Sequence, residues 1–218
     1  DSNNKSALNN LAALNYFNGD IDEAEILYKH SLKYNEDNHE AKYSLAQCQL
    51  AKSNYIEGWK NFESRWFATQ FDSKKLKSNI PKFNLSMGKK NLLLWSEQGI
   101  GDQILFIRFI TNLKPFVNNL FINIDNRLHK IIERVYPKVK FLIKNELNKN
   151  NNINAQLPLG DLGSLFVKGN SDLIKINNTY LTSDSYLKNE LKNKLKTQKK
   201  YICGLSWISK NNDIGDNK

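Results

Sequence analysis

The first seventy residues nearly repeat themselves with a period of 34 residues. Leu11 and Ala12 recur as Leu45 and Ala46, and similar matches flank them. A period in this range is typical of stacked helix–turn–helix units, each of which buries its apolar face only against its neighbours. The sequence therefore predicts two such units over residues 1–68. Leu11, Ala12 and their counterparts are expected on the inner face, where small alanines allow the helices to approach closely.

The turns between these helices carry residues that begin and end helices. Gly19 can end a helix in the left-handed conformation, which glycine adopts without strain. Asp20 and Asn54 precede the second helix of each unit, each with a glutamate three residues later, which predicts capping boxes. These features resemble tetratricopeptide repeats, which bind peptides or other domains or act as spacers, and both roles stay open. Arg65 departs from the resemblance, because such repeats have a small residue there.

From residue 89 onward, short apolar runs alternate with amphipathic stretches. This alternation predicts a parallel sheet covered by helices. The expected fold class is therefore α plus α/β, with helical repeats (1–68), a linker (69–88), a parallel-sheet domain (89–198) and the start of another domain (199–218). The expected strands are 91–95, 120–124, 139–143, 155–159 and 201–206. The expected helices are 104–116, 127–135, 162–166 and 186–195, with an asparagine-rich loop at 145–154.

The first strand-to-helix turn, Trp95–Asp102, reads WSEQGIGD and allows three interpretations. A dinucleotide-binding loop needs a third glycine where Ile104 stands, although Asp125 is placed as a ribose-binding acid would be. A Walker-type phosphate loop is excluded, because no Gly-Lys-Ser/Thr is present. Thirdly, Asp102 could be a general base for an acceptor hydroxyl. Its alternative is a helix N-cap, where the cap geometry and the helix dipole would lower its pKa.

Four segments, in the same order, resemble one family. Residues 92–108 (LLLWSEQGIGDQILFIR) resemble the start of the glycosyltransferase-like domain of bacterial tetratricopeptide proteins. That domain is similar to heptosyltransferases and, more distantly, to protein O-linked N-acetylglucosaminyltransferases. Residues 58–66 (GWKNFESRW) resemble the end of the repeats in the same group. Residues 157–165 (LPLGDLGSL) resemble a later stretch of its first domain, and residues 202–207 (ICGLSW) resemble the strand that opens its second domain. The resemblance implies a two-domain glycosyltransferase of GT-B architecture, whose Rossmann-like N-terminal half is residues 89–198.

The same resemblance implies the roles of individual residues. Asp102 would be the base or the carboxylate that orients the acceptor. The acceptor side would be lined by Glu97, Gln98, Gly99, Gly101 and Gln103. The nucleotide-sugar side would begin with Ser206, Trp207, Ser209 and Lys210, with Lys210 near the leaving phosphate. Such enzymes stabilise the leaving diphosphate with helix dipoles and basic residues, so neither a metal nor a cofactor is expected. The implied partners are a nucleotide-sugar donor, a glycan or protein hydroxyl acceptor, and a protein bound to the repeats.

Composition bears on partners and compartment. The chain carries a formal net charge of +10, but its lysines are dispersed, so a solvated surface is expected rather than a nucleic-acid site. No apolar run approaches the roughly eighteen residues of a membrane span, so no transmembrane segment is expected. Cys48 and Cys203 lie far apart and fit neither a metal site nor a disulfide framework, which predicts a reducing, cytoplasmic compartment.

The chain begins at Asp1 and ends at Lys218, just after the motif that opens the second domain. We therefore expect a fragment that lacks most donor contacts and does not turn over by itself, while its parent transfers sugar to a hydroxyl. Two alternatives stay open. One is a non-catalytic interaction scaffold built on the repeats, and the other is a dinucleotide-dependent activity.

Overall fold

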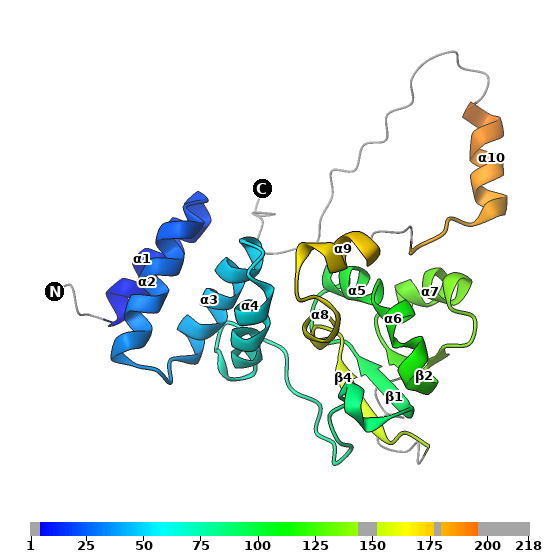
Figure 1. Ribbon diagram of the computed structural model, residues 1–218. Coiled ribbons are helices and arrows are strands. Elements are labelled where there is room, and N and C mark those ends of the chain that lie inside the picture. Colours follow the sequence, from blue (N-terminus) through cyan, green and yellow to red (C-terminus); the bar gives the residue numbers. More distant parts are fainter. Residues whose placement is uncertain (1–4, 144–151, 177–179, 196–218) are drawn as a thin grey trace. The chain divides into compact units, whose positions relative to one another are not determined.

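The computed structural model describes residues 5–143, 152–176 and 180–195 (Figure 1). They fall into two units, divided after Leu181. The second unit contains helix α10 (Ser185–Leu195), which confirms the helix expected at 186–195. Its first turn is held by Asp184, whose carboxylate accepts hydrogen bonds from the backbone N–H groups of Tyr186 and Leu187 at 3.0 and 3.1 Å.

The N-terminal part folds into two helix–turn–helix pairs, in agreement with the 34-residue period (Figure 1). The helices are α1 (Lys5–Asn18), α2 (Ile21–Tyr34), α3 (His39–Ala51) and α4 (Tyr55–Phe62), and the 3-10 helix η1 (Glu63–Phe67) continues α4. Ala12 and Ala46 are fully buried, as expected of small residues at helix crossings. Leu45 is also buried, in a cluster with residues of α1 and α2.

Leu11 does not follow its counterpart Leu45, because 49% of it is exposed. The α1–α2 pair covers α3, whereas among the described residues no helix precedes α1 to cover the equivalent position. The prediction that Leu11 lies on a buried inner face is therefore wrong for these residues.

The helix ends follow the predicted positions but only part of the predicted chemistry. Gly19 ends α1 with φ at 90°, which confirms its left-handed conformation. Asp20 and Asn54 occupy the N-cap positions of α2 and α4, but neither side chain accepts a capping hydrogen bond. Their ψ angles of 65° and 73° depart from the extended backbone that capping needs, so the predicted capping boxes do not form. Asn38 does cap α3, by accepting from the N–H of Ala41 at 3.0 Å.

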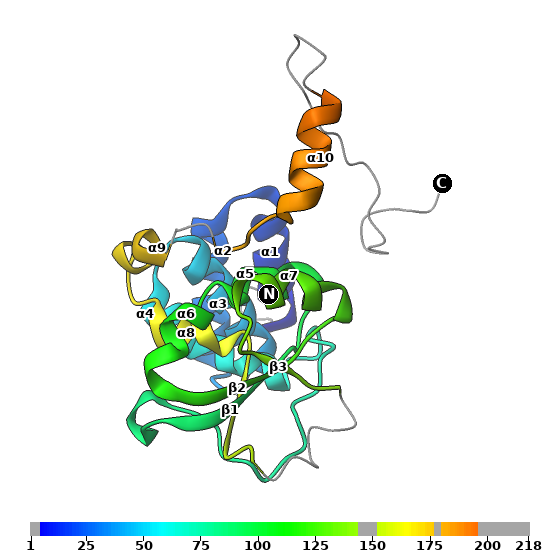
Figure 2. The same cartoon turned by 90° about the vertical axis from the view of Figure 1, so that its right-hand side faces the viewer.

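Four strands form an all-parallel sheet in the order β3-β2-β1-β4. They are β1 (Lys90–Trp95), β2 (Val117–Asn123), β3 (Lys140–Phe141) and β4 (Ala155–Pro158). Figure 2 shows the first three strands of this order, β3, β2 and β1. The register of the sheet is given by Leu92 of β1, which pairs with Leu120 of β2 on one side and with Ala155 of β4 on the other. The predicted strands in this region are confirmed, although β3 is shorter than expected. The strand expected at 201–206 lies outside the described residues.

Short helices connect the strands. The helix expected at 104–116 is divided into α5 (Ile100–Ile107), α6 (Ile110–Leu113) and the 3-10 turn η3 (Lys114–Phe116). The break follows from a tight i→i+3 hydrogen bond, in which the N–H of Phe109 donates to the carbonyl of Phe106 at 3.1 Å. Between β2 and β3 lie η4 (Asn126–Leu128) and α7 (His129–Val135). After β4 come α8 (Asp161–Phe166) and α9 (Asn170–Ile176), of which α9 was not predicted.

The two faces of the sheet are covered differently. Leu92 and Leu94 belong to the main core with residues of α5, α6, α7 and α8. Leu93 and Trp95, on the other face, pack in the described structure against Trp66 and against two residues of the predicted linker, Leu76 and Ile80. The expectation of a sheet covered by helices therefore holds for one face, whereas the described cover of the other comes from the end of the repeats and the linker.

The predicted linker is also partly joined to the sheet. The N–H of Phe83 donates to the carbonyl of Gln156 at 2.8 Å, and the N–H of Gln156 donates to the carbonyl of Pro81 at 3.0 Å. Residues 81–83 thus run beside β4 as a short parallel bridge, before the 3-10 turn η2 (Leu85–Met87). The segment between repeats and sheet is held at this end rather than free.

The repeats pack directly on the sheet region, because α4 contacts α8 (Figure 1). The Trp59 ring lies 5.5 Å from that of Phe62 and 6.4 Å from that of Phe106 on α5. The hydroxyl of Tyr55 donates to Asn170 Oδ1 at 2.9 Å. No helix among the described residues is both long and apolar enough to cross a bilayer.

Gly163 on α8 gives a test of this packing, since a Cβ there would overlap the Trp59 indole. We expect Gly163→Ala to lower the free energy of unfolding by about 1–3 kcal/mol, as overpacking does. Gly101→Ala on α5 is the matched control, because no atom lies within 4 Å of its Cβ position and alanine favours helices. Urea unfolding measures both. Equal stability of the two variants would mean that Trp59 is not held against α8.

Candidate functional site

The candidate site lies at the carboxyl ends of β1 and β4. The order of the sheet reverses between these strands, because β2 and β3 add on one side of β1 and β4 on the other. Ligands of open parallel sheets bind outside the strand ends at such a reversal. The turn after β1 contains Glu97 to Gly101, and the turn after β4 contains Gly160 and Asp161. These two turns therefore form the candidate site.

Glu97 is enclosed between the two turns, with only 1% of its side chain exposed. Its Oε1 accepts from the N–H of Gly160 at 2.9 Å and from Arg65 Nη2 at 3.2 Å. A Cβ on Gly160 would overlap this Oε1, so glycine is needed for the carboxylate to reach the turn after β4. Glu97 would contact an acceptor, as the sequence predicts, only if these contacts opened.

Arg65 contacts both turns. Its side chain is completely buried, and its Nη2 lies 2.5 Å from Asp161 Oδ1 as well as 3.2 Å from Glu97 Oε1. The guanidinium is 4.4 Å from the ring centroid of Phe62 and 4.3 Å from that of Trp66, within cation–π range. An arginine of the repeat region therefore holds two carboxylates of the sheet region.

Lys82 completes this group from the linker. Its Nζ lies 2.7 Å from Asp161 Oδ2 and 2.5 Å from Glu63 Oε1. Burial lowers the pKa of Lys82, but the charges of Asp161 and Glu63 outweigh it and raise the pKa overall. Arg65, Lys82, Glu97 and Asp161, hereafter the Arg65 network, join the repeats, the linker and both strand ends.

The charge state of Glu97 is set mainly by burial. Burial raises the pKa of Glu97 to about 7, with Arg65 opposing the shift and the nearby Asp161 charge adding to it. Its Oε2 is buried and has no hydrogen-bond partner among the described residues. The second oxygen of an ionised Glu97 would be unsolvated, which is the physical reason that the protonated form is favoured.

A pH dependence of stability follows from this shift. The folded chain holds the Glu97 proton up to about pH 7, whereas the unfolded chain releases it near the ordinary value of 4.5. The stabilisation is complete below the unfolded value, and the free energy of unfolding falls as the pH rises from there to about 7. Glu97→Gln keeps the acceptor oxygen but cannot titrate, so its stability should fall less over this window. Urea unfolding at about pH 5 and about pH 8 compares the two proteins, and identical pH dependence would contradict the shift.

Asp102 lies on the first turn of α5, but Gly99 is the N-cap of that helix. The Asp102 carboxylate is half-buried, and the backbone amides of Asp102 and Gly99 lie near enough to stabilise its negative charge. Burial raises the pKa of Asp102, and the two amides oppose it without cancelling it. The alternative of an N-cap with a lowered pKa is therefore wrong in both parts. A raised pKa makes this carboxylate a stronger base than an ordinary aspartate.

The repeats also come within electrostatic reach of Asp102. Burial raises the pKa of the Tyr43 phenol on α3, Arg65 opposes this rise, and the Asp102 charge adds to it. Tyr43 is itself buried, so its phenol is not available as a contact for a ligand at Asp102. The half-buried Asp102 therefore lies in a region to which both the sheet and the repeats contribute.

The two glutamines of the turn have different surroundings. Gln103 is buried, donates to the Gln98 carbonyl at 2.9 Å and accepts from the N–H of Asp125 at 2.8 Å. It thus ties the turn after β1 to the end of β2. The side-chain oxygen Oε1 of Gln98 is buried and has no hydrogen-bond partner among the described residues. A ligand hydroxyl could donate a hydrogen bond to this oxygen only if the turn opened to expose it.

Gly99 and Gly101 are both exposed, so the backbone of the first α5 turn faces solvent. The first N–H groups of a helix have no partner within the helix and carry partial positive charge. Beside them, the half-buried Asp102 carboxylate and the glycine backbone form the part of the predicted site that a ligand can reach.

Asp125 is already paired. Its carboxylate accepts from Arg127 Nε at 2.9 Å and from Arg127 Nη2 at 2.8 Å, and this pairing lowers its pKa to about 2. A dinucleotide ribose would have to compete with this bidentate pair. The donor-side residues Ser206, Trp207, Ser209 and Lys210 lie outside the described residues. Where the structure describes the chain, no three His, Cys, Asp or Glu side chains form a group suited to a metal ion.

Sequence reasoning did not assign site roles to Arg65, Lys82 or Asp161. Arg65 did leave a signal, because it is a charged residue at a position where a repeat has a small one. Lys82 and Asp161 gave no such signal, because nothing in their local sequence shows that their side chains form ion pairs close to Arg65. Neither the protein-family models nor the curated proteins contain a match to this sequence.

Proposed function

We propose that residues 89–198 are the acceptor-binding, Rossmann-like half of a GT-B glycosyltransferase, and that Asp102 is its general base. The observation that carries the proposal is the half-buried Asp102 carboxylate, which has a raised pKa and lies beside an exposed glycine turn at the strand-order reversal. The strand order and the parallel pairing agree with this architecture, and the four sequence motifs supply its chemistry.

In this reaction Asp102 accepts the proton of the acceptor hydroxyl as the oxygen attacks the anomeric carbon of the donor sugar. The new C–O bond forms while the bond to the diphosphate breaks, and the diphosphate leaves with the electron pair. The raised pKa suits this role, because proton transfer is most effective when the base has a pKa nearer the working pH. The buried Gln98 amide oxygen, which has no hydrogen-bond partner among the described residues, would orient the acceptor once binding exposed it.

The helical repeats would serve the acceptor rather than the donor. They are fixed to the sheet by the buried Arg65 network, at the strand ends that carry the proposed base. A protein or glycan bound along the repeats would thus keep a constant distance to Asp102. We infer that the repeats select the acceptor.

A non-catalytic scaffold is the second candidate, and exposed apolar side chains favour it. Leu14 on α1 is 61% exposed, Phe17 is 84% exposed, and Ile26 on α2 is 59% exposed. Such side chains on neighbouring helices are suited to contact another protein. A scaffold would keep this surface but would have no need of a nucleotide sugar.

Calorimetric titration separates the two candidates. The complete gene product that carries these residues is titrated with nucleoside diphosphates and with nucleotide sugars, without added metal. Saturable binding of a nucleotide sugar supports the transferase. If the folded protein binds none of them, the transferase proposal fails and the scaffold takes its place.

A further inference from the structure

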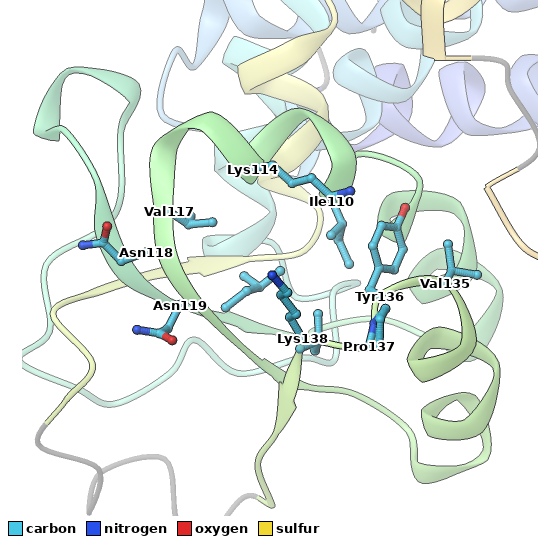
Figure 3. A pocket seen from close by; sticks show the side chains of 11 residues that line it. Ile110, Lys114, Val117, Asn118, Asn119, Val135, Tyr136, Pro137 and Lys138 are labelled. Atoms are coloured by element: carbon cyan, nitrogen blue, oxygen red, sulfur yellow. The ribbon is translucent and has the colours of Figure 1, made fainter.

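A second concave site lies at the opposite end of the strands from Asp102. It is a pocket of about 460 Å³ between η3, the start of β2 and the loop that precedes β3 (Figure 3). Small-molecule pockets in proteins span about 300–1,000 Å³, so this volume suits a small ligand. The site described above plays no part in it, because none of the lining residues belongs to the Arg65 network or to the Asp102 turn.

The pocket has an apolar floor made of core residues. Ile110 is 2% exposed and Leu120 is 8% exposed, and Val117 is half-buried beside them. Tyr136 forms one wall, and its hydroxyl is 3.1 Å from Thr111 Oγ1 on the neighbouring helix. Because the floor belongs to the core and the wall is hydrogen-bonded, the pocket is preformed rather than dependent on a ligand.

The polar lining of the pocket is positively charged. Lys114 and Lys138 are both exposed at its edge, on different sides of the hollow (Figure 3). The remaining polar side chains of the lining are neutral, and no aspartate or glutamate is among them. Lys114 Nζ lies 5.8 Å from the Tyr136 ring centroid, which holds one positive charge over the wall. An apolar body on the floor would therefore have two ammonium groups above it.

We propose that this pocket binds a small amphipathic anion, with a ring-sized apolar body and one carboxylate or phosphate group. The apolar body packs on Ile110, Val117 and Leu120, and the anionic group lies between Lys114 and Lys138. Two ammonium groups can pair with either kind of anion, because lysine binds as a point charge rather than through a planar fork. This site is independent of the proposed transferase activity.

The test uses methyl-labelled protein and NMR titration with three probes: 3-phenylpropionate, benzyl phosphate and the neutral 3-phenylpropanol. The methyl signals of Ile110, Val117 and Leu120 report occupation of the floor. Lys114→Met with Lys138→Met removes both charges at exposed positions, where folding is not at risk. Lys33→Met with Lys89→Met is the matched control, because both lysines are exposed and neither lines the pocket.

We expect saturable shifts of these methyl signals with at least one anion, and an affinity at least about tenfold weaker for the neutral probe. The Lys114/Lys138 variant should bind that anion about tenfold more weakly, while the control variant binds as the wild type does. The stronger of the two anions identifies the head group. Absence of saturable shifts with both anions overturns the proposal. Equal binding of the neutral probe, or binding that does not change in the Lys114/Lys138 variant, overturns the assignment of an anionic ligand.

Discussion

Arg65→Met is expected to lower the free energy of unfolding by about 3–5 kcal/mol, the cost of removing one partner from a buried ion pair. The substitution leaves the buried Asp161 with the partly exposed Lys82 beside it, and the buried Glu97 with the N–H of Gly160 as its hydrogen-bond donor. It also removes the stacking of the guanidinium on Phe62 and Trp66. Urea unfolding monitored by tryptophan fluorescence measures the loss. Arg65→Lys should recover part of the lost stability, because lysine restores the positive charge but neither the planar set of guanidinium donors nor the stacking on the two rings.

Two further variants make this prediction specific. Arg127→Met is the control, because Arg127 also pairs with an aspartate but is 71% exposed, and surface pairs contribute little. Adding Glu97→Gln to Arg65→Met should restore part of the lost stability at alkaline pH, where the buried Glu97 would otherwise have to ionise without Arg65. If Arg65→Met were as mild as Arg127→Met, the network would not hold the repeats to the sheet.

Asp102→Asn is expected to reduce the turnover number of the complete gene product by about 10²–10⁴, the usual contribution of a general base. Asparagine keeps an oxygen that can accept from the Gly99 N–H, but it cannot take a proton from a hydroxyl. The raised pKa of Asp102 also predicts that wild-type activity falls with decreasing pH sooner than an ordinary aspartate would cause. Initial rates of sugar transfer across the acidic range measure both effects.

Asp125→Asn separates this account from the dinucleotide alternative. Asp125 is paired with Arg127 and has no part in the proposed transfer, so its substitution should leave turnover nearly unchanged. A large loss in Asp125→Asn together with a small one in Asp102→Asn would reverse the assignment of the two carboxylates. Unfolding curves of both variants exclude loss of fold as the cause.

Local patterns were enough to predict most of the elements. The 34-residue period predicts the two helix pairs, and the apolar runs predict the four parallel strands that the structure describes. Burial accounts for this success, because a helix places its apolar residues on one face and the central strand β1 is apolar on both of its faces. Capping boxes failed at Asp20 and Asn54 because a cap depends on backbone angles that residue types alone do not fix.

Long-range contacts were out of reach of these patterns. Arg65 and Asp161 are 96 residues apart in the chain, and no periodicity links an ion pair of this kind. The same holds for Phe83 and Gln156, whose backbone pairing makes the linker an edge of the sheet. The N-cap alternative for Asp102, with its lowered pKa, is wrong because the sequence shows the place of Asp102 near a helix start but not its burial.

Acceptor-dependent release of nucleoside diphosphate is the measurement that tests the central proposal most directly. The complete gene product is given a nucleotide sugar, with and without a panel of glycan and peptide hydroxyl acceptors. The account predicts release of nucleoside diphosphate that rises with one class of acceptor and is matched by sugar on that acceptor. A folded protein that binds nucleotide sugars but never releases diphosphate, with any acceptor of the panel, would contradict it.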